Sequence, residues 1–170
     1  TYTNSYTPAP DTPRALATLY TGRYPKSNGC KSRIEWPGFY IDQNLYTLFS
    51  FLSDNKFKIY TTFSRNEIEC GILPKKDNSL ITNFNTLKLL LNANIFNEDN
   101  KNDCYFINLQ DYHYCISDYN SLPIANKIGQ RKLIESFELL YSHIDRDYFD
   151  YTMIFSDHGC RLNDDIRENE

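Results

Sequence analysis

Helix-period and strand-like segments alternate along this chain, and that alternation limits its fold more than any other feature. Apolar residues spaced three and four apart predict amphipathic helices, and short apolar runs between polar turns predict strands. The expected helices cover residues 42–53, 84–95 and 125–144, and the expected strands cover residues 57–63, 104–109 and 151–155. This order predicts an α/β fold with a mostly parallel central sheet and helices on both faces.

Two of the expected strands are apolar along almost their whole length. The segments 104–109 and 151–155 are therefore expected to be buried on both faces of the sheet. Polar, proline-containing stretches at 30–39 and 67–83 predict loops. With 170 residues and no clear boundary between segments, the chain is expected to form one domain, residues 1–170.

Composition excludes several classes of protein. Hydrophobic residues make up 41% of the chain and aromatic residues 15%, which excludes a disordered or low-complexity chain. Lysine and arginine number 18 against 22 aspartate and glutamate, so the net charge of −4 argues against nucleic acid as a partner. The apolar runs are far shorter than the roughly 18 residues of a membrane span, and mean hydropathy is −0.59. We therefore expect a soluble chain without a membrane span.

Five cysteines without a Cys-x-x-Cys pair do not form a disulfide framework. Their odd number leaves at least one thiol unpaired. This usage favours a reducing compartment and hence the cytoplasm, and two disulfides with one free thiol are the alternative.

Polar side chains follow two of the expected strands. Asp157 and His158 come directly after the segment 151–155, and His113 lies in the loop after the segment 104–109. The carboxyl ends of parallel strands meet at one edge of a sheet, where ligands bind. A carboxylate beside an imidazole suits a divalent metal such as Zn or Mn. The alternative is an ordinary polar loop at a strand end.

A third segment has the pattern of a helix start. Thr12 precedes Pro13, so Thr12 is expected to cap a helix whose first residue is proline. A hydroxyl there lies at the positive end of the helix dipole, where a bound anion is stabilised. The alternative is that Thr12 is a helix cap and nothing more.

The spacing of these motifs resembles that of the sulfatase branch of the alkaline phosphatase superfamily. Thr12 precedes Thr21-Gly22-Arg23-Tyr24-Pro25 by nine residues, and Asn28-Gly29 closes this pattern. The family's second signature, a hydrophobic strand ending in Ser-Asp-His-Gly, matches Ser156 to Gly159. A weaker third match is the segment that ends in His113.

The resemblance implies an alkaline-phosphatase-like fold and a set of site residues. Thr12 would be the nucleophile and a metal-contacting oxygen, and Asp157 and His158 would be metal ligands. His113 would contact the anionic group of the substrate or its leaving oxygen. The implied cofactor is a divalent metal, with Zn, Mn, Ca and Mg all open.

The residue at the nucleophile position departs from true sulfatases. Those enzymes carry Cys or Ser within Cys-x-Pro-x-Arg and convert it to formylglycine, whereas this chain has Thr12 and no Arg four residues later. Threonine is instead typical of phosphodiesterase, phosphatase and phosphoglycerol or phosphoethanolamine transferase relatives, which form a covalent phosphothreonine. Either Arg65 or Arg14 could supply positive charge.

The resulting hypothesis is a metal-dependent hydrolase or transferase of phosphate or sulfate esters with a small-molecule or glycan substrate. The family's upstream Asp-ended strand and its downstream ligand segment have no match in this chain, so an incomplete fold and a fragment of a larger enzyme are expected. The alternative is a non-catalytic or truncated α/β module that keeps the sulfatase fold.

Overall fold

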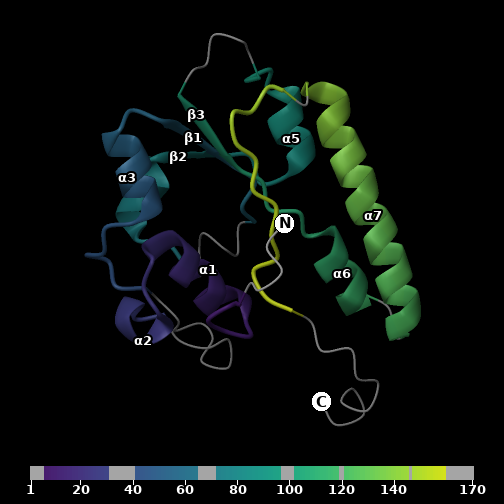
Figure 1. Ribbon diagram of the computed structural model, residues 1–170, viewed down its shortest axis with the longest axis horizontal. Helices are drawn as coiled ribbons and strands as arrows, with labels where there is room; N and C mark the ends of the chain where they lie inside the picture. Colours follow the sequence, from purple (N-terminus) through teal and green to yellow (C-terminus); the bar gives the residue numbers. More distant parts are fainter. Residues whose placement is uncertain are drawn as a thin grey trace.

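The fold is built around a small parallel sheet (Figure 1). In the computed structural model, residues 6–30, 41–64, 72–96, 102–118, 121–145 and 147–159 are described. The strands β1 (Lys58–Thr61), β2 (Ile81–Asn83) and β3 (Asp103–Phe106) lie in the order β2-β1-β3. Ile59 of β1 is in register with Ile81 of β2 and Cys104 of β3. Both pairings are parallel, so the predicted α/β class with a parallel sheet is confirmed.

Helices connect and cover these strands. They are α1 (Thr12–Thr21), α2 (Pro25–Asn28), α3 (Leu48–Asp54), the 3-10 helix η2 (Lys75–Ser79), α5 (Leu87–Asn92), α6 (Asp111–Asp118) and α7 (Leu122–His143). Parallel neighbours cannot be joined by a tight hairpin, so each connection crosses over the sheet. Helix α5 lies in the connection from β2 to β3, and η2 lies in the connection from β1 to β2.

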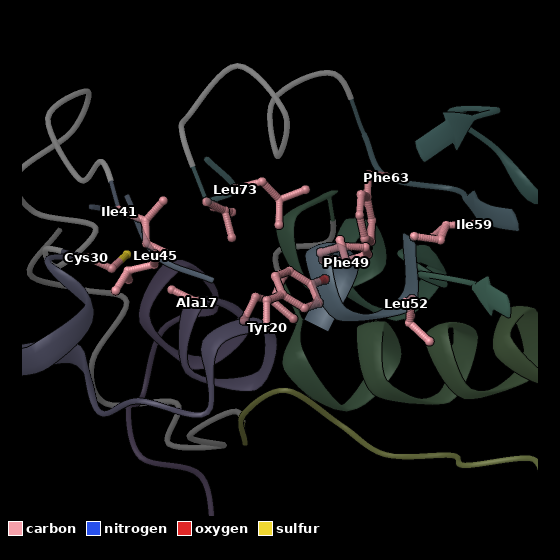
Figure 2. Packing of buried hydrophobic residues seen from close by; sticks show 12 residues of the cluster. Ala17, Tyr20, Cys30, Ile41, Leu45, Phe49, Leu52, Ile59, Phe63 and Leu73 are labelled. Carbon is pink, nitrogen blue, oxygen red and sulfur yellow. The ribbon is translucent and has the colours of Figure 1, made fainter. Parts of the chain in front are cut away.

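One face of the sheet packs against α1 and α3. Ile59 belongs to a core cluster with Tyr20 of α1 and Phe49 of α3, and Figure 2 shows these side chains converging with Phe63. The Tyr20 and Phe49 rings meet edge to face with centroids 4.9 Å apart. Aromatic rings of this size contribute a large share of buried apolar area, so this contact stabilises the position of α1 against the sheet.

The opposite face carries a second cluster. Side chains alternate along a strand, so Tyr60 and its register partner Tyr105 point away from Ile59. Tyr105 stacks on Tyr60 at 5.2 Å and on Phe96 at 4.9 Å. Leu91 of α5 and Leu140 of α7 pack in the cluster on this side. Figure 1 shows α3 on one side of the strands and α5 and α7 on the other. Helices therefore cover both faces of the sheet, as predicted.

The segment 151–155 is not a strand, and this prediction was wrong. No regular structure is assigned to it, and it does not join the sheet of β2, β1 and β3. Tyr151, Met153 and Ile154 are 96%, 77% and 66% exposed. An apolar run favours a buried strand, but a strand also needs a neighbouring backbone to pair with, and the composition of the run does not specify that partner.

Other boundaries also differ from the predictions. The helix expected at 42–53 begins at Leu48 and is capped by Thr47, because the Thr47 hydroxyl accepts a hydrogen bond from the Ser50 amide at 3.2 Å. The expected loop 67–83 contains η2 and β2, and the loop expected around His113 is helix α6.

Several sequence predictions concern cysteines, an arginine and the absence of a membrane span. Cys30, Cys104 and Cys115 are not joined to one another by disulfides, whereas Cys70, Cys160 and Arg65 lie outside the described residues. Within the described ranges, none of the helices has the length and apolar character needed to cross a bilayer.

Candidate functional site

Helix α1 begins at Thr12, within one residue of the expected start, but its cap is Asp11, so the prediction that Thr12 caps the helix was wrong. Asp11 has extended backbone angles (φ −128°, ψ 149°), and its Oδ1 accepts a hydrogen bond from the Arg14 amide at 3.2 Å. Aspartate is among the preferred N-cap residues, so this is an ordinary helix start. The consequence for the site is that the Thr12 hydroxyl is not used as a cap.

The Thr12 hydroxyl instead meets His158. Thr12 Oγ1 lies 2.9 Å from His158 Nε2, although 146 residues separate them in the chain. The segment that carries His158 passes the sheet and reaches the start of α1 (Figure 1). The structure thus brings together two of the residues that the sequence singled out.

The second ring nitrogen of His158 defines the tautomer. Nδ1 lies 2.7 Å from the carbonyl oxygen of Gly159, which can only accept a hydrogen bond. In the tautomer that carries its proton on Nδ1, this contact is a hydrogen bond to the carbonyl and the lone pair lies on Nε2. With that tautomer, Thr12 donates its hydroxyl hydrogen to His158 Nε2.

Asp157 lies next to the same nitrogen. Its Oδ2 is 3.5 Å from His158 Nε2, and both side chains are about one quarter exposed. The Ser156 hydroxyl donates to the His158 carbonyl at 2.6 Å and closes the turn that holds both side chains. Two potential ligand oxygens, from Thr12 and Asp157, therefore lie within 3.5 Å of His158 Nε2, which is a third potential ligand atom.

These three atoms fit a divalent cation in part. Two ligands of one cation with bonds of about 2.0–2.2 Å lie about 2.8–3.6 Å apart. The separations of 2.9 and 3.5 Å around Nε2 fall in that range. The Nδ1 contact to a carbonyl is also the usual outer contact of a metal-binding histidine. Across the described residues, however, no group of three or more His, Cys, Asp or Glu side chains gathers, so Thr12 would have to be the third ligand.

The stretch from Thr21 to Gly29 turns the chain after α1. Gly22 ends α1 with φ at +63°, and Gly29 ends α2 with φ at +80°. Glycine adopts this left-handed conformation without a steric penalty. The buried Asn28 side chain donates to the Arg23 carbonyl at 3.0 Å and accepts from the Cys30 amide at 2.9 Å. These contacts explain the residues of this motif as turn and cap residues.

His113 lies on α6, two residues after the helix begins. Its side chain is exposed, and its ring centroid lies 6.0 Å from that of Tyr114. The hydrogen bond that joins Thr12 to His158 does not involve His113. Its role in contacting substrate therefore stays a prediction.

The ion pair of Asp11 with Arg14 was not predicted from the sequence. Arg14 Nε donates to Asp11 Oδ2 at 2.7 Å, and Nη2 of the same guanidinium also contacts that oxygen. The pair lies near the buried Cys30, whose pKa is raised to about 12, chiefly by burial and also by Asp11, with Arg14 acting in the opposite direction. The signal in the sequence was an Asp three residues before an Arg at a helix start.

Compared with known proteins, the chain matches no protein-family model, no curated protein and no solved structure.

Proposed function

We propose that this chain carries the site of a metal-dependent hydrolase or transferase of phosphate esters, with Thr12 as the nucleophile. The observation that carries this proposal is the 2.9 Å hydrogen bond from Thr12 Oγ1 to His158 Nε2. A hydroxyl that donates to an unprotonated imidazole nitrogen is the arrangement that activates a weak nucleophile. The resemblance to the sulfatase branch, through Thr12 and Ser156 to Gly159, supports the same assignment.

Thr12 Oγ1 would form the new bond to phosphorus while the leaving oxygen departs with the electron pair of the broken P–O bond. The hydroxyl proton passes to His158 Nε2, and the product is a phosphothreonine, which water or an acceptor alcohol then attacks. Nε2 has a single lone pair and cannot take the proton and hold a cation at once. A divalent cation held by the Thr12 and Asp157 oxygens would supply Lewis-acid stabilisation of the developing charge, and His158 Nε2 would then remain the proton acceptor.

The start of α1 contributes charge stabilisation through its dipole. Pro13 has no N–H group, and the amides of Arg14 and Ala15 are bonded to Asp11. The backbone N–H groups of residues 13–15, which could otherwise bind an anion, are therefore absent or already hydrogen-bonded. The positive end of the helix dipole remains next to Thr12, and a developing negative charge on Oγ1 is stabilised by it.

Phosphate esters are preferred over sulfate esters because of the residue type at position 12. The resemblance ties sulfate-ester chemistry to formylglycine, which forms from Cys or Ser, and Thr12 cannot form it. Threonine can accept a phosphoryl group on its hydroxyl.

The test compares Thr12→Val with Thr18→Val in the assay of nitrophenyl phosphate, bis-nitrophenyl phosphate and nitrophenyl sulfate, with Mn, Zn, Ca or Mg added. Thr18 is the matched control, because its hydroxyl donates to the Arg14 carbonyl on the same helix. We expect Thr12→Val to lose about a hundredfold or more of phosphate-ester turnover and Thr18→Val to retain it. Turnover of the sulfate ester alone, or equal activity in Thr12→Val, contradicts the proposal.

The second candidate is a non-catalytic module, and one observation favours it: only two His or Asp side chains gather at the site in the described ranges. A metal titration by calorimetry separates the two candidates. Binding that is lost in Asp157→Ala supports the enzyme, and no binding together with no turnover of any ester supports the module.

A further inference from the structure

The first turn of α1 is held by a carboxylate that makes two kinds of contact. Asp11 Oδ1 accepts the Arg14 amide at 3.2 Å, and Oδ2 accepts the Arg14 guanidinium through Nε at 2.7 Å. The two contacts close a ring over the peptide units from residue 11 to residue 14. Thr12 lies inside this ring.

A neutral cap would make only one of these contacts. Serine, threonine or asparagine at position 11 could accept the Arg14 amide, but only a carboxylate also forms an ion pair with the guanidinium. The Asp11 side chain is 15% exposed and the Arg14 side chain is 29% exposed, so solvent screens this pair less than a surface pair. Both members of the pair act electrostatically on Cys30, which Figure 2 shows beside Ile41 and Leu45 in the core.

We propose that the Asp11–Arg14 pair is a positioning device that directs the Thr12 hydroxyl toward His158 Nε2. The backbone of Thr12 is held between Asp11 and Arg14, and from that backbone the Thr12 hydroxyl lies 2.9 Å from the imidazole Nε2. Only the catalytic consequence of this inference rests on the proposed function. The geometric part concerns a hydrogen bond that exists without substrate.

The experiment follows the ¹⁵N resonance of His158 Nε2 in the metal-free protein. In Thr12→Val, the hydrogen bond is absent, and the resonance moves toward the value of a free imidazole nitrogen. We expect Asp11→Ala to produce most of the same movement. Asp11→Asn keeps the cap acceptor but loses the ion pair, so its resonance should lie between the wild-type and Asp11→Ala values.

The matched control is Thr86→Ala at the start of α5. Thr86 caps that helix by accepting the Leu89 amide at 3.3 Å, so its loss weakens a helix start without touching Thr12. We expect Thr86→Ala to lower the denaturation midpoint while the His158 resonance stays in place. An unchanged His158 resonance in both Asp11→Ala and Asp11→Asn would overturn the proposal. If Asp11→Ala does not fold, an unchanged resonance in Asp11→Asn alone overturns it.

A kinetic measurement tests the catalytic consequence separately. We expect kcat for the phosphate ester to fall about tenfold or more in Asp11→Ala with KM unchanged, since a misdirected nucleophile affects the chemical step. If the resonance moves as expected but the wild-type protein turns over no ester, the positioning role stands and the proposed function fails. If the wild type is active and Asp11→Ala changes neither kcat nor the resonance, the positioning role fails.

Discussion

Removing the buried carboxylate of Asp77 should strongly destabilise the fold. Asp77 is fully buried in η2, and it accepts hydrogen bonds from the Thr47 hydroxyl at 2.5 Å and the Ser50 hydroxyl at 3.1 Å. These contacts tie η2 to the first turn of α3. The carboxylate is therefore a tertiary link between two segments that are about thirty residues apart in the chain.

The magnitude for Asp77→Ala follows from these contacts. Each hydrogen bond to a charged group contributes about 1.5–3 kcal/mol, and a buried hydroxyl without an acceptor adds a penalty. The Thr47 and Ser50 hydroxyls are 3.4 Å apart and can partly satisfy each other, which limits the loss. We expect the free energy of unfolding to fall by about 3–5 kcal/mol, which is about 10 °C in Tm for a chain of this size.

Urea denaturation followed by circular dichroism measures this loss, and a double-mutant cycle with Ser50→Ala isolates one contact. The Ser50 hydroxyl contacts Asp77, whereas the α3 cap uses the Ser50 amide, so Ser50→Ala leaves the cap in place. We expect a coupling energy of about 1–2 kcal/mol between the two substitutions.

The control is Asp54→Ala. Asp54 is exposed and accepts one hydrogen bond from the Tyr46 hydroxyl at 2.8 Å, so its loss should change the midpoint very little. A loss in Asp77→Ala no larger than that in Asp54→Ala, or a coupling energy of zero with Ser50→Ala, would refute the reasoning.

Two further predictions concern the packing of α6 on α7 and the ionisation of a buried thiol. Gly129→Ala places a Cβ 2.9 Å from Tyr112 Cδ2 and 3.3 Å from Cys115 Cβ. We therefore expect the free energy of unfolding, measured by urea denaturation, to fall by about 1–2 kcal/mol. The control Gln130→Ala, at an exposed position of the same helix, should change it little. The raised pKa of Cys30, about 12, means that the unfolded chain releases this proton first as pH rises above 9. Stability should therefore fall between about pH 9 and 12 more in the wild type than in Cys30→Ala, and equal losses in the two proteins would contradict this assignment.

Local sequence patterns predicted most of the regular elements. The strands at 57–63 and 104–109 appear as β1 and β3, and the helix at 125–144 appears as α7, because propensity and side-chain period act within a few residues. The predicted meeting of Thr12 and His158 came from motif spacing and a resemblance, and the structure brings these two side chains to 2.9 Å. The catalytic and metal-binding roles of Thr12, Asp157 and His158 stay predictions, as does the substrate contact of His113.

By itself, the sequence determined the α/β class and the helix start at Thr12, because apolar period and the Thr-Pro pair are local signals. Only the tertiary structure decided that Asp11 caps α1 by accepting the Arg14 amide, and that the Thr12 hydroxyl meets His158 Nε2. It also decided that the apolar run 151–155 stays outside the sheet. The physical reason is the same in each case. A hydrogen-bond partner or a neighbouring strand is supplied by chain that lies elsewhere, and residue order alone does not state which groups meet.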